Sequence, residues 1–309
     1  MKNYKVFDAH CDTLSFLVEK GQTFAHSTAM VKHSYLKKYS AYLQTFACFV
    51  SDSDKEPFQK VLSCVKLFEK EVENQKILHI KTKSDLQKVF EQGKIGGLLA
   101  LENCALLGER IENVHYLYSL GFRMLGLTWN GNNCVGSGVY GEQKGLTDFG
   151  KKVVIHAQKL GMVVDLSHIN EQGFWDMVEV AKKPIICSHS NAKSVHFHLR
   201  NLTDEQIKAV IKTGGVVGVN FYSPFLSDKS RASQKDIIKH IERICGLGGQ
   251  NSVGIGSDFD GIKICAKGIC KASKVYKLFN ELERLGYSSE MVQNIAYKNF
   301  QSVLYRILI

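Results

Sequence analysis

Residues 162–168 read MVVDLSH and residues 184–189 read PIICSH, with one amphipathic stretch between them. Both runs are short and apolar and end in polar residues, which is typical of strands covered on both faces. Six similar runs lie at 4–10, 43–50, 95–102, 123–129, 215–221 and 252–258. The clearest helical patterns span 57–73, 109–120, 147–160, 171–181, 203–213 and 233–246. Eight strands with alternating helices predict an α/β fold, a (β/α)8 TIM barrel, over the alternative of an open doubly wound sheet.

Two segments are additional to the strands and helices of a minimal barrel. Residues 19–42 form a basic insertion after the first strand, and residues 272–305 add two helical stretches after the eighth. The 309 residues are 44% hydrophobic and 23% charged, and no repeat, low-complexity tract or composition break divides them. We therefore expect one domain, residues 1–309.

Polar residues follow the predicted strands where each one ends. In a parallel barrel these ends meet at one face, where active sites are built. The residues that should converge there are His10, Asp12, Glu102, His168, His189 and Asp258. Taken singly, a histidine at a strand end is more often a hydrogen-bonded structural residue, and the carboxylate of Asp258 suits a turn.

Together these residue types predict a metal site. His10 and Asp12 are two positions apart, so both side chains can point toward the barrel mouth. Imidazole and carboxylate suit zinc, and the two oxygens of Glu102 could bridge two ions. His168 and His189 would complete the second ion. Such a pair of ions lowers the pKa of a bound water from about 15.7 to about 7, so the predicted chemistry is hydrolysis.

The chain resembles the membrane dipeptidase (renal dipeptidase) family, peptidase family M19, a branch of the amidohydrolase-type metal hydrolases. The matching segments, in order along nearly the whole chain, are DAHCDT, LALEN, GFRMLGLTWN, GLTDFGKKVV, MVVDLSHI, PIICSHSNAKSV, RNLTDEQIKAV, GGVVGVNFY and VGIGSDFDG. The resemblance implies a metallodipeptidase, a hydrolase of peptide bonds, with two zinc ions and a metal-activated hydroxide. It also implies cleavage of dipeptides that carry a C-terminal D-residue, and a homodimer.

The resemblance assigns roles residue by residue. His10 and Asp12 would hold one zinc ion, His168 and His189 the other, and Glu102 would bridge the two and take part in catalysis. Asp258 would be catalytic and contact the substrate at the attacked bond. Arg200 would bind the substrate carboxylate, because a guanidinium pairs bidentately with a carboxylate.

Trp129 departs from the family. The mammalian branch has a substrate-binding histidine at this position, after Leu-Thr of the fourth predicted strand. An indole N–H can only donate a hydrogen bond, whereas an imidazole can also accept a proton. Substrate binding at Trp129 therefore differs, and hydrolysis of another amide or of a lactone on the same binuclear site remains the alternative function.

Other signals exclude further classes of function. The net charge of +10 arises from dispersed lysine pairs, which argues against nucleic acid as a partner. With no apolar signal core, membrane anchor or CxxC pair, we expect a cytoplasmic protein without a membrane partner. The GxGxxG match at 136–141 lies in a loop and predicts a flexible segment over the barrel mouth, not a dinucleotide site. His196 and His198 are expected to face solvent, with lining of the pocket as the alternative. Cys265 and Cys270 form an isolated pair, for which a disulfide or metal role is the less favoured interpretation.

Overall fold

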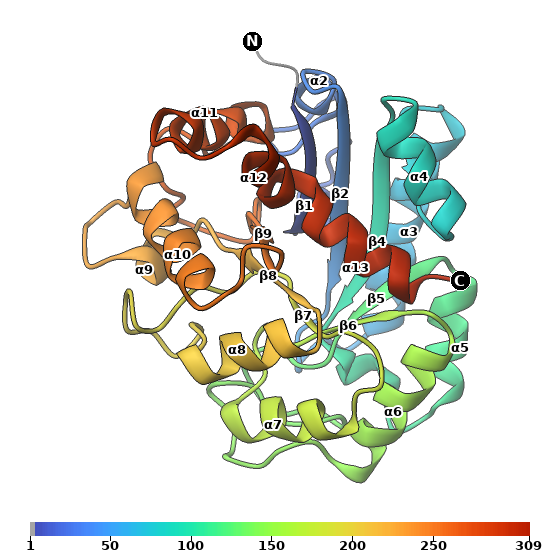
Figure 1. The fold of residues 1–309 in the computed structure, drawn as a ribbon. Helices are drawn as coiled ribbons and strands as arrows, with labels where there is room; N and C mark the ends of the chain where they lie inside the picture. Colours follow the sequence, from blue (N-terminus) through green and yellow to red (C-terminus); the bar gives the residue numbers. More distant parts are fainter. Residues whose placement is uncertain (1–3) are drawn as a thin grey trace.

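Eight parallel strands close into a barrel in the computed structural model, which describes residues 4–309 (Figure 1). They are β1 (Lys5–Cys11), β2 (Ala41–Phe49), β4 (Ile95–Glu102), β5 (Phe122–Gly126), β6 (Val163–Asp165), β7 (Ile186–Cys187), β8 (Val216–Val219) and β9 (Val253–Ile255). Their order is β2-β1-β9-β8-β7-β6-β5-β4, and β2 pairs in turn with β4 from Tyr42↔Ile95 to Phe49↔Glu102. This last pairing closes the sheet, so the predicted (β/α)8 barrel is confirmed.

A ninth strand was not predicted from the sequence. The two-residue β3 (Leu78–His79) pairs with Gly96 and Gly97 of β4, before β5 begins to pair with β4 at Leu99. A Cβ atom on Gly97 would lie 2.5 Å from the ring of Phe68, so glycine permits the close packing of helix α3 (Pro57–Glu73) against β4. Two residues carry no periodicity from which a strand could be inferred.

All six predicted helices are present, with ends shifted by up to three residues. Besides α3 they are α5 (Glu112–Ser119), α6 (Asp148–Lys159), α7 (Glu171–Val180), α8 (Asp204–Lys212) and α10 (Gln234–Gly246). Helix α8 begins with a capping box in which Thr203 and Gln206 each accept a hydrogen bond from the other's backbone N–H. The sequence did not reveal α1 (Thr13–Glu19), α2 (His33–Leu36), α4 (Lys83–Glu91) or α9 (Ser223–Leu226).

The insertion after β1 is hydrogen-bonded to the loop that follows β9, the last barrel strand. It contains α2 and ends where β2 begins at Ala41, two residues earlier than the apolar run suggested. Asp260, in the loop after β9, accepts hydrogen bonds from the Thr13 hydroxyl (2.6 Å) and from the Met30 backbone N–H (2.7 Å). This carboxylate therefore joins α1 and the insertion to the last barrel strand.

The C-terminal helices pack against the barrel. After the short η2 (Ala272–Lys274) come α11 (Tyr276–Arg284), α12 (Ser289–Gln293), the π-helical turn η3 (Asn294–Lys298) and α13 (Asn299–Ile307). Figure 1 shows α13 lying across the strands, and its Phe300 and Leu304 share one hydrophobic cluster with Phe7 of β1 and Val216 of β8. The Phe7 and Phe300 ring centroids are 5.3 Å apart.

No helix formed by residues 4–309 combines the length and the hydropathy needed to cross a lipid bilayer.

Candidate metal centre

The carboxyl ends of the strands surround a cavity of about 560 Å³. All of the side chains that the sequence placed at this face lie in or beside it, several of them in loops just beyond their strands. Asp12, for example, follows β1 by one residue, and His168 follows β6 by three. The cavity wall includes Asp12, Glu102, Trp129, His168, Arg200 and Asp258.

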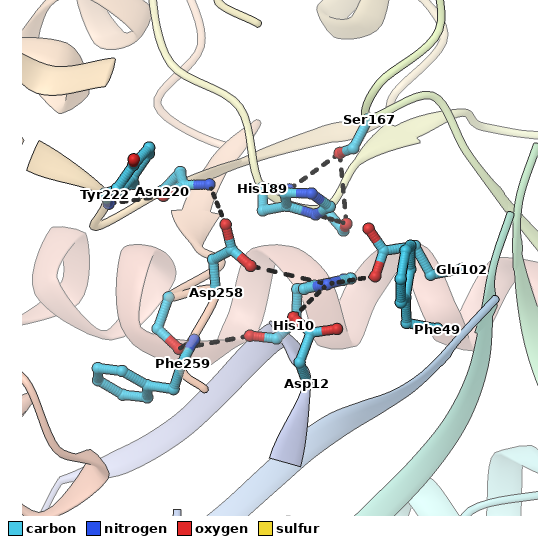
Figure 2. A network of polar contacts seen from close by, with 12 residues as sticks. His10, Asp12, Phe49, Glu102, Ser167, His189, Asn220, Tyr222, Asp258 and Phe259 are labelled. Carbon is cyan, nitrogen blue, oxygen red and sulfur yellow. Dashed lines mark hydrogen bonds and ion pairs between the residues drawn. The ribbon is translucent and has the colours of Figure 1, made fainter. Parts of the chain in front are cut away.

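Glu102 connects two groups of nitrogen and oxygen atoms, and Figure 2 shows its contact with His10. Its Oε2 lies 3.4 Å from Nε2 of His10, while its Oε1 lies 3.2 Å from Nε2 of His168. Asp12 Oδ2 is 3.5 Å from the same His10 nitrogen, and His189 Nε2 is 2.8 Å from His168 Nε2. The two groups, His10–Asp12–Glu102 and Glu102–His168–His189, each have the donors and the spacing to hold a metal ion.

Hydrogen bonds on the far side of each imidazole fix its tautomer. His168 Nδ1 lies 2.9 Å from the side-chain oxygen of Asn130, an acceptor, so this nitrogen carries the proton. His189 Nδ1 lies 2.8 Å from the hydroxyl of Ser188, which in turn donates to Asp165. Both Nε2 atoms therefore direct lone pairs at the centre, where two lone pairs at 2.8 Å repel each other unless a cation is bound.

The electrostatics also fit a cation. Burial opposes the charging of His10, but the carboxylates of Glu102 and Asp12 outweigh it and raise the pKa of this imidazole well above its usual range. His10 Nε2 is buried and has no hydrogen-bond partner of good geometry within residues 4–309. Burial, and then the charge of Arg200, lower the pKa of His168 to about 4. The carboxylates thus favour a positive charge beside His10, a neutral His168 keeps its Nε2 lone pair available, and the donor set fits a divalent metal ion.

Asp258 lies beside the cluster, and its two carboxylate oxygens have different neighbours. Its Oδ2 accepts a hydrogen bond from the Asn220 side chain (2.8 Å), and its Oδ1 is 4.0 Å from His10 Nε2 (Figure 2). Burial raises the pKa of this carboxyl group above its ordinary value. Asn220 was not singled out from the sequence. Its position could have indicated a site residue, because it is a polar residue near the end of the apolar run 215–221.

Arg200 is 4% exposed and lines the cavity. One of its guanidinium nitrogens, Nη2, donates to the His189 carbonyl (3.4 Å), and the guanidinium carbon Cζ lies 5.7 Å from the Phe225 ring centroid. Its buried Nε has no hydrogen-bond partner in the part of the chain that the structure describes. The guanidinium therefore keeps donor capacity free next to the cavity.

The expectation for the two neighbouring histidines was wrong. His198 lines the cavity, packs against Phe225 with 4.3 Å between ring centroids and 42° between the ring planes, and accepts a hydrogen bond from the Arg200 backbone N–H. His196 is also partly buried, and its Nε2 lies 3.1 Å from the Pro224 carbonyl. Their loop folds back against α9, which the sequence did not reveal.

Trp129 forms an aromatic wall of the cavity. Its ring packs edge-on against Phe49 with 5.1 Å between centroids, and 6.4 Å separates it from the His168 ring. The segment 131–145 continues from this wall, and Tyr140 also lines the cavity. The backbone N–H of Val139 donates to the His168 carbonyl (2.9 Å), which attaches the segment to the metal centre.

A closed parallel barrel with a buried cluster of histidines and carboxylates at its carboxyl end is the architecture of a metal-dependent hydrolase. The particular family follows from the sequence: residues 1–307 match the model of membrane dipeptidase (peptidase family M19). The chain belongs to this family and is a metallodipeptidase.

Individual proteins are similar to this chain in sequence or in fold. A Klebsiella pneumoniae protein described as an uncharacterized protein in the pqqA 5′ region is 32% identical over 232 residues, 72% of this chain and 85% of its own length. Among solved structures, the M19 metallopeptidase dipeptidase AC has a TM-score of 0.92 at 24% identity, covering 99% of both chains. A Rhodobacter sphaeroides metallopeptidase bound to a phosphinate mimic of L-Ala-D-Ala has a TM-score of 0.90 at 23% identity, covering 99% of this chain and 100% of that one. These two likenesses show the same fold.

Proposed function

We propose that this protein hydrolyses dipeptides with a pair of zinc ions. The observation that carries the proposal is the position of Glu102, whose two carboxylate oxygens face His10 and His168 separately. His10 and Asp12 would hold one ion, and His168 and His189 the other, with Glu102 shared between them. When bound, the ions would polarise the scissile carbonyl and lower the pKa of a bound water.

The remaining roles belong to side chains of this chain. Arg200 binds the C-terminal carboxylate of the dipeptide through its free donors, because a buried guanidinium strongly favours a carboxylate partner. Asp258 holds the proton of the attacking water at Oδ1 and passes it to the leaving amine, while Asn220 orients the carboxylate through Oδ2. Trp129 contacts the substrate through its ring.

Binding of the free carboxylate by Arg200 limits the length of the substrate. The peptide bond must reach the metal centre while Arg200 holds the C-terminus, so longer peptides would place the wrong bond there. The structural neighbour from Rhodobacter sphaeroides was crystallised with a mimic of L-Ala-D-Ala. This supports, for our protein, a dipeptide substrate that carries a C-terminal D-residue.

The bridging role of Glu102 has a direct test. The Glu102→Ala protein should lose bound metal and nearly all hydrolysis of dipeptides such as L-Ala-D-Ala, as measured by elemental analysis and by amine release. A variant that kept two ions and full activity would refute the role. Wild-type protein loaded with two zinc ions but inactive on every dipeptide of a panel would instead favour the alternative, hydrolysis of another amide or a lactone. Trp129 in place of histidine is the observation that keeps this alternative in view.

We also propose that residues 1–309 act as one domain and assemble as a homodimer, as in the family. The sharing of one hydrophobic cluster by α13 and the barrel strands supports the first statement. Light scattering of the purified protein tests the second, because a monomeric mass at micromolar concentration would contradict it.

A further inference from the structure

A tight turn after β9 brings two cysteines to one carbonyl oxygen. Ala266 O lies within hydrogen-bond distance of both sulfur atoms, 3.0 Å from that of Cys270 and 3.5 Å from that of Cys265, and it accepts a hydrogen bond from the backbone N–H of Ile269 (3.4 Å). The turn requires glycine at position 268, whose φ is +89°. Two sulfur atoms that share one acceptor lie close together, and both thiols are free.

Arg231 contacts both cysteines of this pair. Its Nη2 lies 3.4 Å from the Cys270 sulfur, and its Nε donates to the Cys265 carbonyl (3.1 Å). The hydrogen bond from Cys265 and then the guanidinium of Arg231 lower the pKa of Cys270 to about 6, against the opposing effect of burial. Cys270 is half-buried, whereas Cys265 is only 3% exposed. An accessible thiol that ionises readily beside a second, protected thiol is the usual arrangement of a redox-reactive pair.

We propose that Cys270 and Cys265 form a peroxide-reactive dithiol, with Cys270 as the attacking thiol and Cys265 as the resolving one. The Cys270 thiolate attacks one peroxide oxygen, the O–O bond breaks, and the departing hydroxide or alkoxide takes up a proton. Cys270 is then a sulfenic acid. The Cys265 sulfur attacks it, a disulfide forms and water leaves, so the peroxide is reduced and two thiols are oxidised.

Cys48, Cys64 and Cys245 lack this combination. Cys48 and Cys64 are also neighbours, but both are fully buried, and oxidants do not reach such thiols. Cys245 is half-buried like Cys270, but burial raises its pKa to about 11. The pair is thus distinguished by access and ionisation together, and Cys245 serves as the matched comparison.

The dithiol lies behind a wall of the catalytic cavity. Ile264 O accepts from Ser223 N (2.8 Å), and Ala266 N donates to Phe221 O (3.0 Å), so the cysteine segment pairs with the chain around Tyr222. Tyr222 and Ile262 line the cavity. The proposal goes beyond the proposed dipeptidase function and does not depend on it, because its readout is cysteine chemistry.

The experiment treats the full-length protein with a small excess of hydrogen peroxide at pH 7. Thiol titration under denaturing conditions should show the loss of two of the nine thiols, and peptide mapping should find a Cys265–Cys270 disulfide. In Cys265→Ser the sulfenic acid cannot be resolved, so dimedone should label Cys270. The Cys245→Ser protein should behave like the wild type. Loss of thiols elsewhere, or no faster modification of Cys270 than of Cys245, would overturn the proposal.

Discussion

The Nε2 atoms of His168 and His189 face each other at 2.8 Å although the two residues follow different strands, β6 and β7. Each ring uses its Nδ1 for a hydrogen bond to a neighbouring side chain, so neither Nε2 has a proton to offer the other. Burial lowers the pKa of both imidazoles, which keeps them neutral and available as ligands at pH 7. This contact supports the proposal that the two residues share a metal ion.

Removing one member of this pair should therefore separate metal binding from folding. Zinc added to chelator-treated wild-type protein should raise Tm, because a ligand at 100 times its Kd stabilises by about 2.7 kcal/mol. His168→Ala should bind about half as much zinc and show a smaller rise in calorimetry. The control is His156→Ala, since Nδ1 of His156 lies 2.9 Å from the Lys152 carbonyl of its own helix and His156 does not line the cavity. An unchanged zinc response in His168→Ala would contradict the ligand role.

Arg200→Lys keeps the positive charge but loses the planar pair of donors. For a dipeptide acid we expect kcat/KM to fall by about 30-fold or more, about 2 kcal/mol, the lower range for disturbing a buried charge pair. For the same dipeptide with a C-terminal amide, wild type and variant should be nearly equal. Arg243→Lys is the control, because Arg243 pairs with Asp204 on the surface. An equal loss on acid and amide would show that Arg200 acts on folding rather than on the carboxylate.

Much of the candidate site could be predicted because each candidate ligand lies at or just after the end of an apolar run. MVVDLSH and PIICSH both end in histidine, and parallel strands in a barrel bring such ends together whatever their separation in sequence. The fold could be predicted for the same reason, since eight buried runs between amphipathic helices leave few other architectures.

The rest depended on how the loops fold. Asn130 and Asn220 orient His168 and Asp258 from other loops, and no spacing in the sequence links these partners. The position of Asp12 was expected from strand alternation, yet it follows the end of β1, and the β1–β2 register shifts between Asp8 and Cys11. The partners of a side chain in a loop are set by tertiary packing, which local patterns do not contain.

Trp129 should report substrate binding directly. The chain has two tryptophans, and the other, Trp175, packs on Phe174 of the outer helix α7. In a Trp175→Phe protein, binding of a dipeptide or of a phosphinate analogue should change the fluorescence of Trp129, because its ring forms the cavity wall. Trp129→Phe, which retains Trp175, should give no response. A response that followed Trp175 instead would place the ligand outside the cavity.

His240 should make stability depend on pH. It is fully buried, its Nδ1 accepts from the Ala192 backbone N–H (3.1 Å), and its Nε2 lies 3.2 Å from the Leu226 carbonyl. Protonation of Nδ1 would break the first of these hydrogen bonds. Burial lowers the pKa of this imidazole from 6.5 to about 4.

Between these two pH values the unfolded chain binds a proton that the folded chain does not, so stability rises with pH and is lost as pH falls from 6.5 toward 4. The loss from His240 alone is about 3 kcal/mol at 1.36 kcal/mol per pKa unit. Urea unfolding at pH 7 and pH 4.5 should show a smaller difference for His240→Asn than for wild type, although the variant is less stable at pH 7. The other buried histidines, including those of the metal centre, contribute equally to both proteins and cancel in the comparison. Equal pH dependence in the two proteins would mean that folding does not lower the pKa of His240.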